Sequence, residues 1–251
     1  GLGDAEVIVG ADGINSGVRR RHEAAFGPTV EQGLARYAWL GTAQRFDAFT
    51  FCIVENEHGV FQAHAYQFAP DRSTFIVECD EASWRAAGFD RLDADASLRL
   101  CERMFAPWLG GHALMSNARH LGGMGWTRFA QVKNERWSDG NVVLVGDAAH
   151  TAHFSIGSGT KLAMEDAIEL VAQFQKHGTG DVHKVLHAYE KVRHPEVDRV
   201  QRAAQPSLEW FENSARYMGQ PPEQLTFNLM TRSKRITWEN LRLRDPALVA
   251  K

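Results

Sequence analysis

The chain has 251 residues, 28 basic and 31 acidic side chains, a formal net charge of −3 and 44% apolar residues. This size and composition suffice for one large or two small domains and exclude a disordered or fibrous protein. Nucleic-acid backbones are bound by clustered positive charge, and because the only basic block is residues 19–21, we expect no nucleic-acid partner. Since no apolar run approaches the roughly 20 residues that cross a bilayer and no signal pattern opens the chain, we expect a cytoplasmic protein outside the membrane.

Several kinds of chemistry are disfavoured by residue spacing. The cysteines are odd in number and far apart, which predicts buried thiols in a reducing compartment rather than disulfides. His150 and His153 have no third ligand nearby, so we predict no metal site. Neither Ser155 nor Ser158 stands in the Gly-x-Ser-x-Gly turn of a hydrolase. The cysteines are Cys52, Cys79 and Cys101.

The chain opens with a strand and a helix. Residues 7–9 are apolar and precede a glycine turn at 10–13, a pattern typical of a buried strand. Ser16 is the expected N-cap of a helix over 18–26, which Gly27 and Pro28 end.

An antiparallel sheet follows, because aromatic and β-branched residues recur with period two. The predicted strands cover 37–42, 46–54, 60–68 and 74–77, with turns at 57–59 and 70–72. Two helices are expected next, over 81–87 and 94–105, the second ended by Pro107.

The final part returns to the opening pattern. After a strand at 126–133 and a turn at 138–141, four consecutive apolar residues at 142–145 predict a strand buried on both faces, as in a parallel sheet. The remaining sequence is helical, over 161–174 and then over 182–212 with an interruption near His194 and Pro195.

The strongest motif is Gly146-Asp147 at the end of that buried strand. It precedes a glycine-rich loop, residues 157–160, that opens a helix containing Asp166. A carboxylate beside free backbone N–H groups suits a ribityl or ribose hydroxyl next to a phosphate or an electron-rich ring. The alternative is a turn in which the aspartate only caps a helix.

A second motif has the same character. Asp12-Gly13, followed by Asn15, Ser16 and Arg19, again links a buried strand to a helix. The two motifs, in this order and separated by an antiparallel sheet, resemble the aspartate-glycine and glycine-aspartate motifs of the single-component flavoprotein aromatic hydroxylases, the family with the p-hydroxybenzoate hydroxylase fold.

Longer strings narrow the resemblance to the hydroxylase half of salicylyl-CoA 5-hydroxylase and 2-aminobenzoyl-CoA monooxygenase/reductase proteins. The chain departs from the wider family at His153-Phe154, where a Pro-Pro pair is common, and at Lys161, where asparagine is common. The strings cover residues 37–42, 61–66, 153–160, 209–213, 231–233 and 240–244.

The resemblance implies an α/β (α+β) fold, with part of a three-layer FAD-binding domain (1–34 and 134–180), an inserted antiparallel substrate sheet (35–133) and a helical C-terminal region (181–251). It also implies an enzyme that uses FAD, NAD(P)H and O₂ to hydroxylate a 2-hydroxy- or 2-aminobenzoyl-CoA at position 5 through a flavin C4a-hydroperoxide. No side chain is singled out as a catalytic base. The implied cofactor-binding residues are Asp12, Gly13, Arg19, Gly146, Asp147, Gly157, Ser158, Gly159 and Thr160.

The resemblance further suggests a substrate pocket. His64 and Tyr66 alternate with alanines on one predicted strand, so they face either this pocket or a solvated or satisfied sheet face. The basic tail either meets CoA phosphates or, as we favour, forms a solvated helix face. The suggested pocket residues are Trp39, His64, Tyr66, His153, Phe154 and Ile156; the tail residues are Arg232, Lys234, Arg235, Arg242 and Arg244.

One family element is absent from the sequence. No Gly-x-Gly-x-x-Gly string follows a strand and opens a helix, although this string lets the backbone approach the FAD pyrophosphate. We therefore expect a fragment that begins within the FAD domain and stops before the reductase domain of the bifunctional proteins. A tryptophan- or indole-type flavin hydroxylase, and a non-catalytic substrate-binding module, remain alternatives.

Overall fold

The computed structural model describes residues 5–116 and 125–249. The chain forms two compact units. The first unit comprises Gly1–Gln32, Ala130–Trp210 and Thr226–Lys251, and the second comprises Gly33–Phe129 and Phe211–Leu225. Strand and helix bounds place residues of β2, β7, α7 and α8 in both units.

The first unit contains a three-stranded sheet in the order β1-β9-β8. Strand β1 (Ile8–Gly10) is parallel to β9 (Val142–Leu144), and β8 (Ser138–Asp139) is antiparallel to β9. All three residues of β9 are buried, which confirms the prediction from its apolar run.

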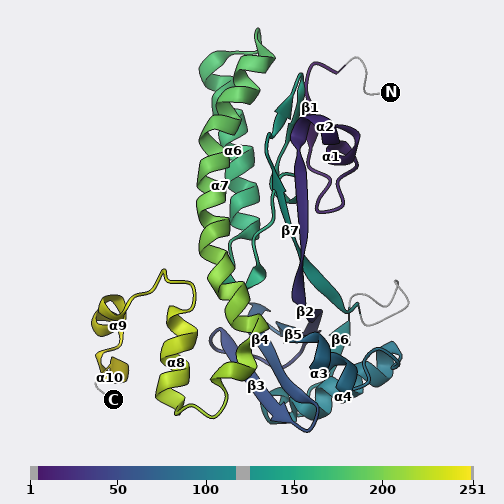
Figure 1. The fold of residues 1–251 in the computed structure, drawn as a ribbon, viewed down its shortest axis with the longest axis vertical. Coiled ribbons are helices and arrows are strands. Elements are labelled where there is room, and N and C mark those ends of the chain that lie inside the picture. The colour runs from purple at the N-terminus through teal and green to yellow at the C-terminus, as the bar shows by residue number, and fades with distance from the viewer. Residues whose placement is uncertain (1–4, 117–124, 250–251) are drawn as a thin grey trace. The chain divides into compact units, whose positions relative to one another are not determined.

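Two long helices accompany this sheet, α6 (Gly159–His177) and α7 (Val182–Glu212), and they lie side by side in the first unit (Figure 1). Leu162 and Leu170 of α6 and Leu186 and Tyr189 of α7 pack in one apolar core with β9. The other helices of the chain's two ends are α1 (Gly17–Arg21), α2 (Glu23–Phe26), α8 (Pro222–Thr231), α9 (Trp238–Arg244) and α10 (Pro246–Val249).

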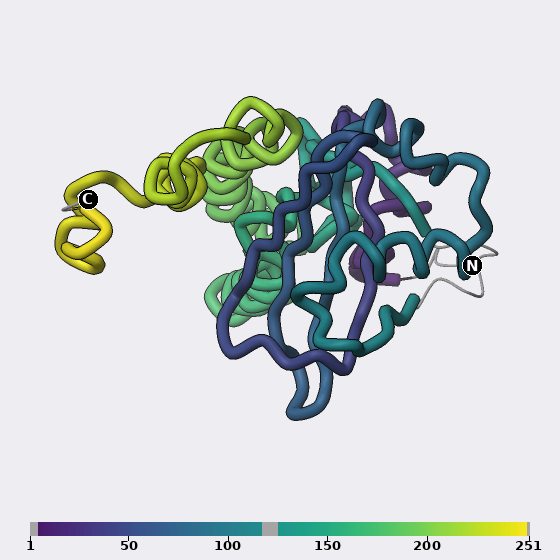
Figure 2. Tube along the Cα trace, turned by 90° about the horizontal axis from the view of Figure 1, so that it is seen from below, coloured from purple at the N-terminus to yellow at the C-terminus, as the bar shows by residue number. Residues whose placement is uncertain are grey.

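The second unit is built on an antiparallel sheet in the order β3-β4-β5-β2-β6, with β7 also paired to β2. Strands β3, β4 and β5 run side by side (Figure 2). The strands are β2 (Pro28–Thr42), β3 (Thr50–Asn56), β4 (Gly59–Ala69), β5 (Arg72–Cys79), β6 (Leu114–Ser116) and β7 (Thr127–Asn134).

One face of this sheet forms the core of the second unit. Phe61, Phe75 and Val77 pack there against Leu98 and Phe105. The helices of this layer are α3 (Glu81–Ala86), α4 (Ala94–Met104) and α5 (Ala106–Leu109). Cys52, Cys79 and Cys101 are free and buried in this core, as predicted, and burial raises the pKa of the Cys52 thiol to about 12.

Several boundary predictions are wrong. The strand predicted over 37–42 begins at Pro28. The helix predicted over 18–26 is two short helices, because His22 leaves the helical conformation and its Nδ1 lies 3.0 Å from Asp139 Oδ2. The strand predicted from residue 46 begins at Thr50, since Phe46 fills the core from a loop. The helix predicted over 94–105 does end before Pro107, at Met104. Pro107 itself lies in the first turn of a further helix, α5, where its missing N–H costs nothing.

The predicted interruption near Pro195 is also wrong, because α7 continues through Pro195 and Pro206. Each proline removes one intrahelical hydrogen bond. Side chains beside Pro195 offset this loss: Arg193 Nε donates to Asp166 Oδ1 at 2.9 Å, and His194 Nε2 lies 2.9 Å from the carbonyl oxygen of Asn134.

No helix within residues 5–116 and 125–249 has both the length and the apolar composition of a membrane span.

Candidate functional site

The two sequence motifs meet at one edge of the sheet. Because β1 and β9 are parallel neighbours, the turns that follow them lie at the same edge. Arg19 joins the two turns. Its buried guanidinium donates to the carbonyl oxygen of Ala148 at 2.8 Å and also to the carbonyl oxygen of Ile14. The structure thus brings Arg19 beside the Gly146-Asp147 motif, 127 positions later in the sequence.

In the first turn, the carboxylate of Asp12 is occupied by its own helix. It accepts hydrogen bonds from the Ser16 hydroxyl, from Gly17 N–H at 2.7 Å and from Val18 N–H at 3.1 Å. Burial opposes ionisation of Asp12, but these hydrogen bonds outweigh it and hold the pKa of the carboxyl below its ordinary value. Ser16 caps the helix as predicted, accepting from Arg19 N–H.

In the second turn, the carboxylate of Asp147 is exposed, and it takes part in no hydrogen bond between described residues. The backbone before it is special: Gly146 has a φ of +58°, where a Cβ would lie 3.2 Å from the Cβ of Ala163. A side chain at position 146 would therefore be both strained and crowded. The turn presents Asp147 outward at the end of β9.

The glycine-rich loop opens α6 without blocking its first turn. Ser158 is the N-cap, yet no side chain caps this helix end. A Cβ at Gly157 or at Gly159 would meet nothing within 4 Å, so a ligand can approach this backbone closely. The exposed N–H groups and the positive end of the helix dipole favour an anion or an electron-rich ring edge.

A buried ion-pair network fixes the backbone of the second turn from the protein interior. The fully buried Asp166 accepts from Gly146 N–H at 2.9 Å, lies 2.7 Å from His150 Nε2 and accepts from Arg193 Nε at 2.9 Å. Burial alone would raise the pKa of Asp166, but the contacts with His150, Gly146 and Arg193 lower it. Asp166 therefore stays ionised and fixes the turn that presents Asp147.

Sequence reasoning singled out Asp166 but missed its partner Arg193. A signal for Asp166 was available, since it lies four residues from both Leu162 and Leu170 and thus on the buried face of α6. Arg193 carries no such local signal, because its partners lie about 27 residues earlier and only the packing of α6 on α7 brings them together.

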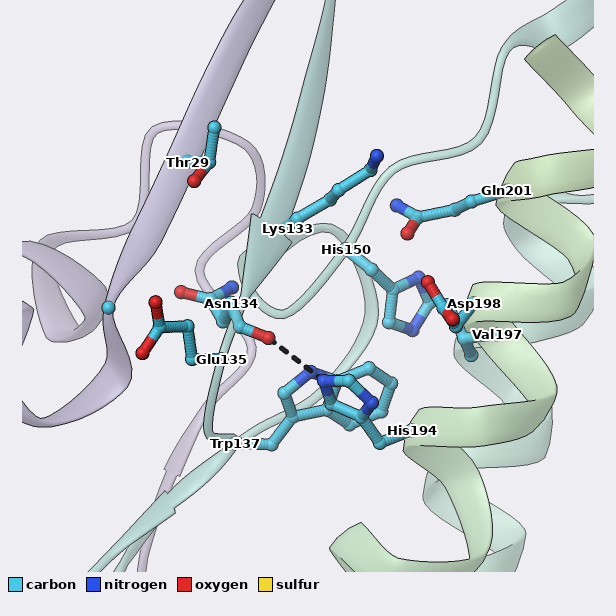
Figure 3. Close-up of a pocket in the computed structure, with 11 residues that line it drawn as sticks. Thr29, Lys133, Asn134, Glu135, Trp137, His150, His194, Val197, Asp198 and Gln201 are labelled. Atoms are coloured by element: carbon cyan, nitrogen blue, oxygen red, sulfur yellow. Dashed lines mark hydrogen bonds between the residues drawn. The ribbon is translucent and has the colours of Figure 1, made fainter.

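A cavity of about 230 Å³ adjoins this network within the first unit (Figure 3). Three anchoring side chains from its lining hold the segment after Asp147: Asn134 Nδ2 donates to Ala149 O, Gln201 Nε2 donates to Thr151 O, and the His150 ring stacks on Trp137. The buried Asn134 Oδ1 has no hydrogen-bond partner among the described residues, and the cavity is roomy enough to hold ordered water beside it.

Three of the six predicted pocket residues, His153, Phe154 and Ile156, lie in the segment after β9. His153 is buried, and its Nδ1 lies 2.8 Å from Ser155 Oγ. Arg232 reaches the same place, donating to Ser155 O at 2.9 Å and to Ser207 Oγ at 3.0 Å. This residue is therefore not part of a solvated helix face, as the sequence suggested, but ties the C-terminal region to the loop after β9. Phe154 and Ile156, both half-buried, flank Ser155 in a 3₁₀ turn.

The other three predicted pocket residues lie in the second unit. Trp39 and His64 are both cross-strand neighbours of Ile76, and Tyr66 is opposite Thr74, so all three lie on the sheet face away from the helical layer. His64 is buried, with Nε2 3.1 Å from Glu78 Oε2. Its ring centroid is 4.5 Å from that of Phe211.

The three side chains differ in their surroundings. His64 belongs to a hydrogen-bonded and packed sheet face. Tyr66 is half-buried and stacks on Phe49, with ring centroids 5.3 Å apart. Trp39 is exposed and lines a cavity.

The first unit fits a flavin dinucleotide. Asp147 offers a carboxylate for ribityl hydroxyls, the start of α6 offers N–H groups beside glycines with open space, and Arg19 offers a buried cation. Burial lowers the pKa of Arg19, which the charge of Asp12 counteracts. Among the residues that the structure describes, no three His, Cys, Asp or Glu side chains gather as a metal site.

Comparison with solved structures shows the fold. PqsL of Pseudomonas aeruginosa in complex with 2-aminobenzoylacetate is 22% identical, with a TM-score of 0.58 over 85% of this chain and 58% of that one. A 2-methyl-3-hydroxypyridine-5-carboxylic acid oxygenase is 17% identical, with a TM-score of 0.59 over 94% of this chain and 58% of that one.

Curated relatives are closer in sequence. A salicyloyl-CoA 5-hydroxylase from a Streptomyces species is 42% identical over 99% of this chain and 48% of its own length. A 3-hydroxy-4-methyl-anthranilyl-[aryl-carrier protein] 5-monooxygenase from Streptosporangium sibiricum is 40% identical over 96% of this chain and 62% of its own. A protodeoxyviolaceinate monooxygenase from Chromobacterium violaceum is 36% identical over 84% and 55%.

The chain therefore spans about half to three fifths of the length of these relatives. The profile of the family described as "FAD binding domain" matches residues 4–204, a range that contains both strand-end motifs and the sheet between them. This match and the geometry of the two turns agree, and the chain belongs to the FAD binding domain family.

Proposed function

We propose that this chain is part of an FAD-dependent monooxygenase that hydroxylates an aromatic ring. The observation that carries the proposal is the meeting of the two motifs at one sheet edge, where Arg19 bonds to Ala148 and Asp147 stays exposed. FAD, when bound, supplies the activation of O₂ with electrons from NAD(P)H. The protein's part is to bind, orient and exclude water.

Each element of the first unit has a role in this proposal. Asp147 accepts hydrogen bonds from the ribityl chain, and the uncapped start of α6 stabilises negative charge on the reduced ring system. Arg19 lines the pyrophosphate side and Asp12 orders its helix. The apolar side chains of Phe154 and Ile156 keep water from the reacting centre.

For the substrate, we propose a benzoyl thioester with an OH or NH₂ group ortho to the carbonyl. Two relatives that align with nearly all of this chain, at 42% and 40% identity, are named for such aromatic acids, one linked to CoA and one to an aryl-carrier protein. The ring is electron-rich para to its donor group, so hydroxylation at position 5 follows from the substrate's own electronics. A flavin reductase domain following this chain, as in the bifunctional proteins that it resembles, is the partner that we propose.

The test uses the full-length protein that contains this chain. Purified protein should retain FAD through gel filtration, and NAD(P)H oxidation should be coupled to a 5-hydroxylated product with salicyloyl-CoA or 2-aminobenzoyl-CoA. Asp147→Ala should lose the flavin and the product together. Retained flavin without product from either thioester, or from their carrier-protein forms, would contradict the proposed substrate class.

A second candidate is favoured by the relative named for protodeoxyviolaceinate, a name that includes neither CoA nor a carrier protein. In that case the substrate is a free aromatic acid, such as an indole or tryptophan derivative. The same coupled assay with free acids separates the two candidates, because only the second one predicts turnover without a thioester.

A further inference from the structure

A second cavity, of about 470 Å³, opens on the sheet of the second unit. It lies over the neighbouring strands β4, β5, β2 and β6, and its lining includes Trp39, Gly41, Phe68, Arg72, Thr74 and Met115. None of these residues takes part in the flavin site described above. The volume is within the range of about 300–1,000 Å³ that small-molecule sites occupy.

The floor of this cavity exists because position 41 has no side chain. Gly41 is opposite Thr74 on β5 and opposite Met115 on β6. A Cβ at Gly41 would meet only the carbonyl oxygen of Ser73, at 3.6 Å, which is ordinary contact. Thus a larger residue at position 41 is compatible with the backbone but would project into the hollow, on the face that Trp39 shares.

Several side chains that line this cavity are apolar and partly exposed to solvent. Trp39 is 41% exposed, Phe68 is 62% exposed and Met115 is 37% exposed. Single exposed apolar residues are ordinary, but three around one hollow mark a surface that binds a ligand. Their size and shape suit a slender organic chain better than an ion.

The rim carries a positive charge. Among the lining residues that the structure describes, Arg72 is the only ionisable one. Its Nε lies 3.7 Å from Asp71 Oδ2, and both side chains are more than half exposed, so this ion pair is weak. The guanidinium is thus available to a phosphate at the end of an otherwise uncharged ligand.

We infer that this cavity binds the phosphopantetheine arm of the thioester substrate. The arm is a slender chain of methylenes and amides that ends in a phosphate, which matches apolar walls with one arginine at the rim. The inference rests on the proposed function. CoA and a carrier protein both present this arm, and they are the two attachments named for the relatives at 42% and 40% identity.

The direct test measures binding without turnover. CoA and 4′-phosphopantetheine are titrated by calorimetry into the flavin-loaded full-length protein. Arg72→Ala should weaken both ligands about tenfold, and Gly41→Leu should abolish binding by filling the hollow. The matched control is Arg91→Ala, because Arg91 is also exposed on the second unit and pairs only loosely with the adjacent Asp90, at 4.0 Å. Equal affinity of Arg72→Ala and wild type for both ligands would overturn the inference.

A kinetic test separates the arm from the ring. With the salicyloyl thioester of CoA, Arg72→Ala should raise KM about tenfold with little change in kcat. With the salicyloyl thioester of N-acetylcysteamine, which lacks the phosphate and most of the arm, the same variant should behave as wild type. A KM change that is equal for both thioesters would refute the assignment.

An assay with the carrier-linked thioester shows whether CoA or a carrier protein presents the phosphopantetheine arm to this protein. Turnover of the carrier-linked thioester that is weakened by Arg72→Ala also supports the inference, with the carrier as the source of the arm. If no thioester is hydroxylated, the proposed function fails, whereas the calorimetric result still decides whether the cavity binds the arm.

Discussion

The two strand-end turns of the first unit have similar sequences but use their aspartates in opposite ways. Asp12 is occupied by Ser16, Gly17 and Val18 of the helix that it begins. Asp147 is left exposed, because Asp166 on α6 accepts the hydrogen bond of Gly146 in its place. In the second turn the carboxylate of Asp147 is available to a ligand, because a different acidic residue anchors the backbone.

The largest expected effect comes from replacing Asp166, the buried acid that accepts from Gly146 N–H. Asp166→Asn should lower the free energy of unfolding by about 3 kcal/mol, since it leaves buried Arg193 without its main counter-charge. Urea unfolding of the chain measures the change. The matched control is Glu165→Gln, a neighbouring, less buried partner of Arg193, for which a loss below about 1 kcal/mol is expected. Equal losses in both variants would mean that burial of the network has no energetic consequence.

The exposed acid should behave in the opposite way. Asp147→Ala should reduce FAD affinity of the full-length protein at least about tenfold, equivalent to about 1.4 kcal/mol. Its free energy of unfolding without flavin should stay within about 0.5 kcal/mol of wild type. Flavin fluorescence titration and urea unfolding measure the two quantities. A destabilised apoprotein with normal FAD affinity would show that we have exchanged the roles of the two aspartates.

The capping acid should have an intermediate effect. Asp12→Ala removes acceptors for Gly17 and Val18 N–H at the start of α1, so a loss of about 1 kcal/mol is expected in the same unfolding experiment. Asp12→Asn, which keeps one side-chain acceptor, should lose less. An Asn variant as unstable as the Ala variant would indicate that the charge, not the hydrogen bonds, stabilises this turn.

The smallest expected effect is a decrease in the free energy of unfolding at acidic pH. The pKa values of Asp12 and Asp166 are lower in the folded chain than their ordinary value of 3.8. At pH values between the folded-state pKa and the ordinary pKa of each aspartate, the unfolded chain binds more protons than the folded chain. Their contribution to the free energy of unfolding is therefore fully present above the ordinary pKa and is lost as pH falls through the folded-state pKa. Urea unfolding from about pH 5 to pH 2 should show this loss, with a reduced slope in Asp12→Asn. An unchanged slope would contradict the assignment to Asp12.

Local patterns were sufficient where neighbouring residues decide the structure. The apolar run at 142–145 predicted a buried strand, and β9 is buried throughout. Ser16 was recognisable as an N-cap, and Pro70-Asp71 as the turn between β4 and β5. In these cases side-chain period and turn chemistry act over a few residues, which sequence displays directly.

Local patterns were misleading where distant contacts decide. Pro195 is normally a helix breaker, yet α7 continues because Arg193 and His194 are held by Asp166 and Asn134. The period-two pattern at 46–54 included Phe46, which packs in the core without belonging to a strand. Such contacts join residues tens of positions apart, and no local spacing encodes them.

The sequence by itself therefore determined the two Gly/Asp motifs, the sheet between them and the family that they resemble, because glycine turns and buried strands are local properties. Only the tertiary structure decided which aspartate is free to meet a ligand. That choice depends on α6 and α7, which bring Asp166, His150 and Arg193 together behind Gly146. A buried charge is stable only with all of its partners in place, and those partners exist only once the chain has folded.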